Sequence, residues 1–372
     1  MRKRIFLSPP YVGNVEKKLL NEAFDSNWIA PLGPQVKHFE KEVADYINVA
    51  GSCALSSGTA AIHLALKVLG IKKGDIVLCP SLTFVASVNP VVYENATPIF
   101  IDVNLGDWVL DIELLEATIK KYKPKFLIAV DLYGQSCDYE NIKYLCNKYG
   151  VFLIEDSAEA LGSVYNDKKC GSFGDISIFS FNGNKIITTS GGGMLVSDNE
   201  NYVEKAKFLS NQGRENFLHY EHKEVGYNYR MSNILASIGR GQLSKIKDFV
   251  KMRRKIFCKY KEAFKDLENI KFIKGKKISK SNHWLTVFRI NSKKGNKYRD
   301  KIINALEREN IESRPVWKPM HLQPLYKNFR YITRPNKDNS KFLFERGICL
   351  PSGSNLKEQE QDFIINIIKS IF

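Results

Sequence analysis

The sequence lacks the features that would place the protein in a membrane or in the secretory pathway. No run of about eighteen apolar residues occurs, so the sequence predicts no membrane-spanning helix. The basic start, residues 1–6, is followed by neither a continuous apolar segment nor a small-residue cleavage site, which predicts no signal peptide. We therefore expect a cytoplasmic protein with no membrane partner.

The cysteines and the charge balance exclude further classes of protein. The seven cysteines form no C-x-x-C pair and no zinc-type cluster with histidine, so we expect neither disulfide bonds nor a metal site. Basic residues outnumber acidic ones, which gives a formal net charge of +16. A charge of this sign favours binding to nucleic acid, to an anionic membrane surface or to a small anionic substrate. The basic residues are spread along the chain without interleaved aromatic residues. We interpret them as a solvated basic face that favours an anionic substrate, and we expect no nucleic-acid partner.

The order of apolar segments between residues 50 and 200 predicts an α/β domain. Short apolar runs alternate there with helical patterns, which is typical of βαβ units around a mostly parallel sheet. The expected strands are 76–79, 98–103, 126–131, 152–155, 176–181 and 193–197, and the expected helices are 59–69, 86–93, 112–122 and 139–149.

The pattern changes in the last third of the chain. We expect a helix to begin near Ser232, and the basic amphipathic stretch 243–267 predicts a long connecting helix. Beyond residue 269 the sequence predicts a strand at 284–290 and helices at 299–309 and 358–372. The chain should therefore form a large α/β domain at 1–245 and a smaller α+β domain at 246–372 that includes the connecting helix.

Lys185 occupies an unusual setting for a lysine. It lies between the apolar stretches 176–181 and 194–196, close to a triple glycine at 191–193. Partial burial favours the neutral amine, which can attack a carbonyl to form a Schiff base. The alternative is an ordinary lysine at the end of a loop, with its ammonium group in water.

Other segments could supply further parts of one pocket. Gly58 and Thr59 begin a helix and could hold a phosphate there, or they could simply cap the helix. Asp156 ends an apolar strand and could pair with a protonated ring nitrogen, or cap a helix. Glu159 could face the same pocket or complete a capping box with Asp156. Phe84 could stack on a planar ring or pack in the core.

Together these segments offer the contacts that pyridoxal phosphate needs, and the sequence resembles the DegT/DnrJ/EryC1/StrS family of sugar aminotransferases. The resemblance extends from residue 26 to residue 353, and its densest motifs are 155–162, 171–175, 180–193 and 226–231. It implies the aspartate-aminotransferase fold type I, with a mostly parallel central sheet in the large domain. It also implies a homodimer with active sites at the subunit interface.

The resemblance implies a role for each candidate residue. Lys185 would form the Schiff base with the cofactor, and Asp156 would pair with the pyridine nitrogen. The other implied cofactor contacts are Gly58, Thr59, Phe84, Glu159 and Ser180, together with Asn228 and Arg230 from the neighbouring subunit. The implied substrate contacts are Trp28, Glu159, Arg314, Lys318 and His321.

The sequence departs from the family pattern at two positions. Glu159 stands where many relatives have glutamine or histidine beside the ring oxygen of the cofactor. Asp131 replaces a common histidine, a change that concerns the strand end more than the chemistry.

The implied reaction transfers an amino group from glutamate to C-4 of a nucleotide-linked 4-keto-6-deoxy sugar. Segments 181–190 and 317–321 look most like relatives that aminate UDP-2-acetamido-2,6-dideoxy-hexos-4-ulose for surface glycans or glycoproteins. GDP-perosamine synthase is the alternative specificity. A dehydratase of this family would carry histidine in place of Lys185, and a non-catalytic basic binding or regulatory protein on the same fold is the alternative of another class.

Overall fold

A computed structural model describes residues 3–372 of the protein, so that Met1 and Arg2, the start of the segment considered for a signal peptide, lie outside the described residues. The helices are α1 (Asn14–Asp25), α2 (Pro34–Ile47), α3 (Gly58–Val68), α4 (Asn89–Tyr93), α5 (Ile112–Tyr122), α6 (Tyr139–Tyr149), α7 (Glu200–Ser210), α8 (Asn233–Leu243), α9 (Ile246–Ala263), α10 (Gly295–Arg308), α11 (Asn339–Arg346) and α12 (Glu358–Lys369). The strands are β1 (Gly51–Leu55), β2 (Ile76–Pro80), β3 (Thr97–Ile101), β4 (Phe126–Val130), β5 (Phe152–Asp156), β6 (Val164–Tyr165), β7 (Lys168–Lys169), β8 (Ile176–Ser180), β9 (Gly193–Ser197), β10 (Ile270–Phe272), β11 (Ser279–Lys280), β12 (Thr286–Ile290), β13 (Arg314–Pro315), β14 (Tyr331–Ile332) and β15 (Gly347–Leu350).

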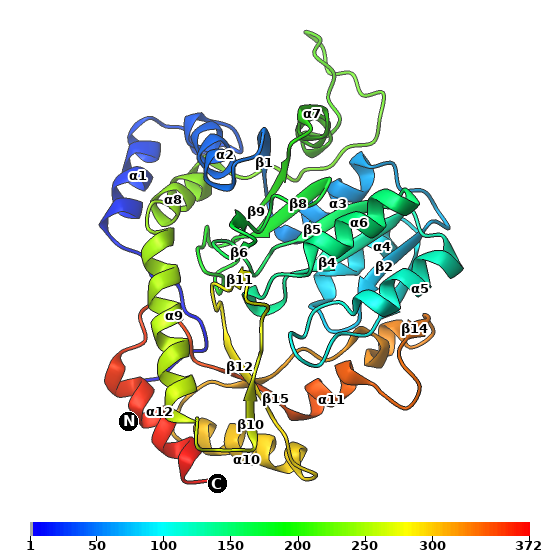
Figure 1. Cartoon of the computed structure of the whole chain (residues 1–372). Coiled ribbons are helices and arrows are strands. Elements are labelled where there is room, and N and C mark those ends of the chain that lie inside the picture. Colours follow the sequence, from blue (N-terminus) through cyan, green and yellow to red (C-terminus); the bar gives the residue numbers. More distant parts are fainter. Residues whose placement is uncertain (1–2) are drawn as a thin grey trace.

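An eight-stranded sheet in the order β1-β9-β8-β5-β4-β2-β3-β14 forms the centre of the larger unit (Figure 1). Strands β8, β5, β4, β2, β3 and β14 pair in parallel, whereas β9 runs antiparallel to both β8 and β1. The sheet is therefore mostly parallel, as predicted. Parallel strands end at the same edge of a sheet, which is where open α/β folds bind their ligands.

Helices cover both faces of this sheet because its strands are apolar on both faces. Along β4, Phe126, Ile128 and Val130 pack in one cluster with residues of α3, α4 and α7. Leu127 and Ala129 pack in another cluster with residues of α2, α5 and α6. Successive side chains of a strand point to opposite faces, so a strand buried on both faces reads as a continuous apolar run.

The smaller unit lies at the end of the molecule that carries both chain termini (Figure 1). Its antiparallel sheet has the order β10-β12-β15-β13. Apolar residues of β12 and β15 pack with side chains of α9, α10 and α12 in a separate core cluster. This α+β arrangement agrees with the pattern predicted for the last third of the chain.

The chain crosses between the two units more than once. Strand β14 lies between β13 and β15 of the small unit in sequence, but it pairs with β3 of the large sheet. In the other direction, Ile5 forms a bridge with Ile311, and the Ser352 N–H donates to the Leu7 carbonyl at 2.8 Å. The domain boundary between residues 245 and 246 stays a prediction, and short segments from each side of it lie in the other unit.

The helix and strand predictions differ from the structure in a few places with clear causes. The sequence pattern did not indicate β1 or β14, and β14 is too short to show a period. The helix expected at 86–93 is interrupted at Val88, because Pro90 fits only the first turn of a helix. The helix expected at 243–267 is α9, which begins at Ile246; Leu243 is instead the last residue of α8.

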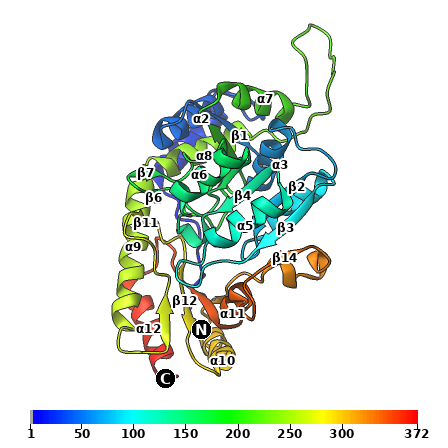
Figure 2. The same cartoon turned by 45° about the vertical axis from the view of Figure 1, so that its right-hand side comes forward.

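The segment between α7 and α8 projects from the body of the molecule in both views (Figures 1 and 2). It exposes large apolar side chains, among them Leu218, Tyr220 and Val225. Its base is closed by a bridge between Asn211 and Asn228. Exposed apolar side chains on a projecting segment are typical of a contact surface for another chain.

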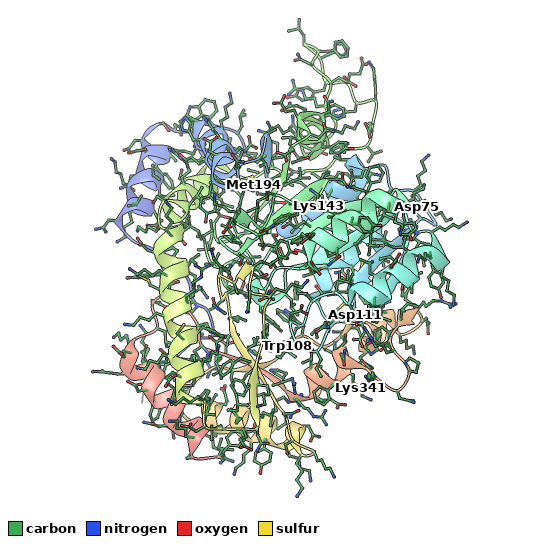
Figure 3. The ribbon with its side chains drawn as sticks, in the orientation of Figure 1. Asp75, Trp108, Asp111, Lys143, Met194 and Lys341 are labelled. Atoms are coloured by element: carbon green, nitrogen blue, oxygen red, sulfur yellow. The ribbon has the colours of Figure 1, made fainter. Side chains whose placement is uncertain are left out.

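The described residues 3–372 contain no helix that is both long enough and apolar enough to cross a bilayer. The seven cysteines are free thiols. Met194 of β9, labelled in Figure 3, is fully buried, as expected for a strand covered by helices on both faces.

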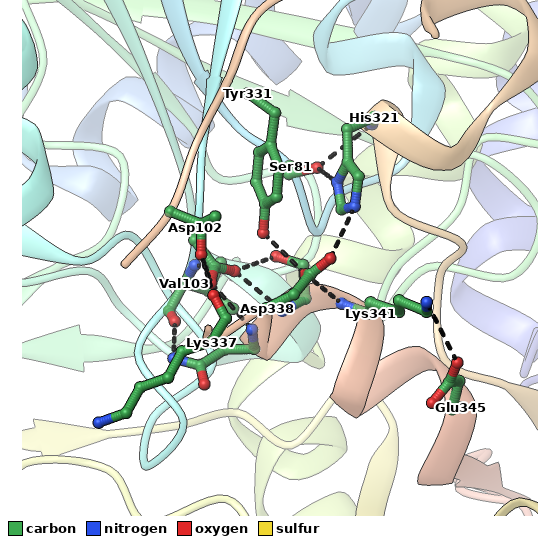
Figure 4. Close-up of polar contacts among 12 residues, drawn as sticks. Ser81, Asp102, Val103, His321, Tyr331, Lys337, Asp338, Lys341 and Glu345 are labelled. Atoms are coloured by element: carbon green, nitrogen blue, oxygen red, sulfur yellow. Dashed lines mark hydrogen bonds and ion pairs between the residues drawn. The ribbon is translucent and has the colours of Figure 1, made fainter. Parts of the chain in front are cut away.

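Two buried aspartates of the large unit hold the segment that carries β14. Asp102 accepts hydrogen bonds from the Asn339 N–H at 2.8 Å, the Ser340 N–H at 2.8 Å and the Ser340 hydroxyl at 2.6 Å (Figure 4). Asp111, labelled in Figure 3, pairs with Arg334 at 2.8 Å. These contacts attach the returning segment to the edge of the large sheet.

We expect Asp102→Ala to lower the free energy of unfolding by about 3 kcal/mol, because several buried donors would lose their acceptor. Urea unfolding followed by tryptophan fluorescence measures this change. Asp45→Ala, at an exposed position of α2, is the control and should change the free energy by less than about 0.5 kcal/mol. Equal effects of the two substitutions would contradict the role given to Asp102.

Candidate active site

A cavity of 270 Å³ lies at the edge of the sheet where β4, β5 and β8 end. Because parallel strands end at one edge, the cavity gathers residues from distant parts of the chain. Seven predicted site residues line it: Gly58, Thr59, Phe84, Asp156, Glu159, Ser180 and Lys185.

The N-terminus of α3 forms one wall of the cavity. The Ser57 side chain caps the helix by accepting a hydrogen bond from the Ala60 N–H at 3.0 Å. The first N–H groups of a helix have no acceptor within the helix, and they lie at the positive end of its dipole. Gly58 packs so closely on Ser180 that a Cβ at this position would lie 3.0 Å from the Ser180 Cβ. This wall can therefore hold an anion that approaches the backbone closely.

Asp156 forms a buried acidic group at the end of β5. The Ser87 hydroxyl donates to Asp156 Oδ2 at 2.6 Å, and the Ala158 N–H donates to Oδ1 at 3.2 Å. Burial raises the pKa of Asp156, while these donors and the nearby Lys185 ammonium oppose the shift. No described helix begins after β5 until α7, so Asp156 is not a helix cap.

Lys185 and Glu159 face each other in the cavity. Lys185 Nζ lies 3.5 Å from Glu159 Oε1, and the two side chains are 12% and 5% exposed. The Tyr133 N–H donates to Glu159 Oε2 at 2.6 Å, from a backbone with a φ of 54°. Burial raises the pKa of Glu159, and the Lys185 ammonium opposes this shift. Lys185 is thus a partly buried amine with a carboxyl group as its neighbour, and Glu159 is not part of a capping box.

Aromatic side chains form the opposite wall. Phe84 is 46% exposed, and its ring centroid lies 5.0 Å from that of Trp317. Tyr133 stacks between Trp317 and Trp284, with centroid distances of 6.3 Å and 6.2 Å. Trp284 and Trp317 both line the cavity. The site therefore combines a polar half with an apolar half.

Sequence reasoning did not identify Trp284, Tyr133 or Ser87 as site residues, and it included Trp317 only as a member of segment 317–321. Tryptophan occurs only four times in the chain, and Trp284 and Trp317 each lie within two residues of a short strand. A rare, large aromatic residue at a strand end was the available clue. The hydroxyl of Ser87 gives no such clue, because its contact with Asp156 depends on the fold.

Several predicted residues do not line the cavity of this chain. Arg230 donates to Asn211 Oδ1 at 2.7 Å, on the side of the sheet near β1. Asn228 is exposed beside it, at the base of the projecting segment. Trp28 is 43% exposed, Arg314 pairs with Glu312 at 3.1 Å, and Lys318 is exposed.

His321, predicted to contact the substrate, is occupied by other contacts. Its Nδ1 lies 2.6 Å from the Ser81 hydroxyl, and its Nε2 lies 3.1 Å from Asp338 Oδ2 (Figure 4). Its ring stacks on Tyr331, with centroids 3.7 Å apart. Both ring nitrogens are engaged, so in this structure His321 joins the segment after Trp317 to the end of β2 rather than lining the cavity.

Asp131 belongs to a buried acidic cluster behind the cavity. Atoms of Asp131, Glu155 and Cys170 lie within 4.8 Å of one another, at a spacing that a metal ion could use. The Ser157 hydroxyl donates to Asp131 at 2.6 Å and to Glu155 at 3.0 Å. Backbone N–H groups and other hydroxyls also donate to these carboxylates. We interpret the cluster as a support for the strand ends, in agreement with the interpretation of Asp131 from sequence.

Comparisons with known proteins agree with this geometry. The sequence model of the DegT/DnrJ/EryC1/StrS aminotransferase family matches residues 10–369. EpsN of Bacillus subtilis, whose name describes a pyridoxal phosphate-dependent aminotransferase, is 48% identical, with 100% of this chain and 97% of EpsN covered. A GDP-perosamine synthase of Vibrio cholerae is 39% identical, with 98% of each protein covered.

The same similarity appears among solved structures. A protein of Streptococcus pneumoniae, named as the sugar aminotransferase Spr1654 and solved in its PMP-form, superposes with a TM-score of 0.92. It is 28% identical, with 99% of this chain and 98% of that chain covered. The fold predicted from the sequence is thus confirmed.

We expect Asp156→Asn to raise the melting temperature of the cofactor-free protein by about 2 °C at pH 7 and to have little effect at pH 4. A carboxyl group with a raised pKa in the folded state stabilises the fold at low pH, and this contribution is lost as the pH rises through that pKa. The neutral amide avoids this loss. Calorimetry at both pH values measures the difference, with Asp45→Asn as the exposed control. A lower melting temperature at pH 7 would contradict the assignment.

Proposed function

This chain belongs to the DegT/DnrJ/EryC1/StrS aminotransferase family, and on this premise we propose that it is a pyridoxal phosphate-dependent sugar aminotransferase. It would transfer an amino group from glutamate to C-4 of a nucleotide-linked 4-keto-6-deoxy sugar. The observation that carries the proposal is the partly buried Lys185 amine, which shares one cavity with Asp156 and the N-terminus of α3.

The residues of the cavity fit pyridoxal phosphate. The α3 N-terminus and the Thr59 and Ser180 hydroxyls suit its phosphate, and Gly58 leaves the room that a Cβ would fill. Phe84 offers an exposed aromatic face for the ring. The Asp156 carboxyl group offers the negative charge that a protonated ring nitrogen requires.

When bound, pyridoxal phosphate supplies an aldehyde that condenses with amines and a ring that accepts an electron pair. Lys185 Nζ would hold the cofactor, and the same amine would move a proton to or from the reacting carbon. Glu159 Oε1 lies 3.5 Å from Lys185 Nζ, close enough to exchange a proton with it, and burial raises the pKa of Glu159. The Asp156 carboxyl group would accept a hydrogen bond from the ring nitrogen of the cofactor, and the Ser87 hydroxyl holds this carboxyl group in place.

For the sugar we propose UDP-2-acetamido-2,6-dideoxy-hexos-4-ulose, on the basis of segments 181–190 and 317–321. The positive net charge favours a substrate that carries a diphosphate. Arg314 and Lys318 are exposed cations on either side of Trp317 and could meet that diphosphate. GDP-4-keto-6-deoxymannose is the second candidate, because a GDP-perosamine synthase is 39% identical to this chain.

We further propose a homodimer that completes each site. Asn228 and Arg230 lie outside the cavity of their own chain, next to the projecting segment with its exposed apolar side chains. From that position they could reach the cofactor phosphate of a neighbouring subunit. Trp28 is exposed and could line the substrate entrance in the same assembly. His321 would contact the substrate only after its own ring contacts are released.

Two other functions are disfavoured by particular residues. A dehydratase of the family would have histidine at the position of Lys185. A non-catalytic binding or regulatory protein would have no need for a partly buried amine between a carboxyl group and an aromatic wall. Purified protein that remains colourless after addition of pyridoxal phosphate would favour this last alternative.

We expect Lys185→Ala to lose covalent attachment of pyridoxal phosphate and to lower the turnover number by at least about 1000-fold, because no other amine occupies its position. The fold should be kept. Borohydride reduction followed by peptide mass spectrometry identifies the attached lysine, and Lys125→Ala, at an exposed position, is the matched control. Turnover similar to that of the wild type would contradict the role of Lys185.

The substrate class can be tested with a panel of UDP-, GDP- and dTDP-linked 4-keto-6-deoxy sugars, with glutamate as the amino donor. We expect the UDP-linked 2-acetamido sugar to be aminated with kcat/KM at least about 10-fold above that of the others, which corresponds to a modest difference in contacts. The mass of each product measures the transfer. Preference for the GDP-linked sugar would replace the first candidate with the second, and amination of none would contradict the proposed class.

A further inference from the structure

The backbone carbonyl next to the reactive lysine is held by two residues from distant parts of the chain. Asn184 immediately precedes Lys185, and its carbonyl oxygen accepts a hydrogen bond from the Ser8 hydroxyl at 2.7 Å. The same oxygen accepts a second hydrogen bond from Trp284 Nε1, also at 2.7 Å. Both lone pairs of this carbonyl are thus used, by one donor from the N-terminal segment and one from the residues that precede β12.

Trp284 also contacts the lysine side chain itself. Lys185 Nζ lies 4.1 Å from the centroid of the Trp284 ring, a cation–π geometry. The tryptophan is 1% exposed and stacks on Tyr133, whose N–H holds Glu159. The amine is therefore placed between a carboxyl group and an aromatic face, and Tyr133 contacts both of these partners.

A buried arginine on the connecting helix α9 fixes both donors. Arg253 Nη1 donates to the Trp284 carbonyl at 2.5 Å, and Arg253 Nη2 donates to the Ser8 hydroxyl at 3.1 Å. Arg253 is 1% exposed, and no ion pair to it occurs among residues 3–372. Burial lowers the pKa of Arg253 to about 9. A buried guanidinium without a carboxylate partner is weak evidence for stability, and the hydrogen bonds of Arg253 link the Trp284 backbone to the Ser8 side chain.

We propose that Trp284 and Ser8 are positioning residues for Lys185, acting on the Asn184 carbonyl and fixed there by Arg253. This inference deepens the proposed function and rests on it. A lysine that attaches a cofactor and then moves a proton has to swing its side chain while its backbone stays in place. The two hydrogen bonds hold the backbone, and the indole ring gives the released ammonium group a resting position opposite Glu159. The small unit and the N-terminal segment thereby set the geometry of a residue on the large unit.

The test uses Trp284→Phe, Ser8→Ala and the double variant. Phenylalanine keeps an aromatic face but loses the N–H, and alanine removes the other donor. Cofactor-free protein is mixed with pyridoxal phosphate, reduced with borohydride at timed intervals, and digested to measure the rate of attachment at Lys185. Because each single variant leaves one donor on the Asn184 carbonyl, we expect each to slow this rate by about 3-fold. The double variant should slow it by at least about 30-fold, since both donors act on one atom.

The sugar plays no part in this measurement. A negative result would therefore contradict the positioning role of Trp284 and Ser8 without contradicting the proposed amino transfer. Attachment at exposed lysines of the same sample is the internal standard for the amounts of cofactor and borohydride, and the far-UV circular dichroism of each variant measures whether the fold is kept. Trp108→Phe, at a buried tryptophan that does not line the cavity, is the matched control and should leave the rate within about 2-fold of that of the wild type. A double variant whose effect is only the product of the single effects, about 9-fold, would overturn the proposal.

Arg253→Lys gives a second route if the double variant does not fold. Lysine keeps the charge but cannot reach the Trp284 carbonyl and the Ser8 hydroxyl together. We expect attachment at Lys185 to slow by at least about 10-fold while attachment at exposed lysines is unchanged. A rate at Lys185 equal to that of the wild type would contradict the positioning role of this network.

Discussion

The carboxyl groups of Glu159 and Asp156 are buried in the cavity that also holds the partly buried Lys185, and the rest of the structure has to replace the solvation that they lose. The replacement comes from donors at other strand ends and loops. The Tyr133 N–H supports Glu159, and the Ser87 hydroxyl supports Asp156. These donors follow β4 and β2, so the charges are tolerated only while the parallel strands stay aligned. The parallel sheet thus brings the hydrogen-bond donors for both carboxyl groups to the same edge.

The apolar half of the site comes from elsewhere in the chain. Trp284 precedes β12 of the small unit, and Trp317 follows β13. Tyr133 of the large unit stacks between them, so the wall is a joint product of both units. Apolar rings exclude water, and charge interactions are stronger where water is excluded. The large unit therefore supplies the polar half of the site, whereas both units together supply the apolar half.

The parts that could be predicted from the sequence are those set by local pattern. Continuous apolar runs indicate the strands of the large sheet, and strand ends indicate Asp156 and the Lys185 segment. A helix start indicates Gly58. The rest depends on contacts between distant residues. The residues next to His321 in the sequence do not indicate that Ser81 and Asp338 contact its ring nitrogens in the folded protein. Nor does any local pattern bring Trp284 to the Asn184 carbonyl.

The late position of β14 in the chain has a consequence for synthesis on the ribosome. The edge of β3 receives its partner only when residues 331–332 have emerged, long after the other strands of the large sheet. Until then the nascent chain presents an unpaired parallel strand edge, the kind of surface at which chains associate wrongly. Slow elongation between residues 102 and 331 would therefore lengthen the period in which a chaperone has to cover that edge.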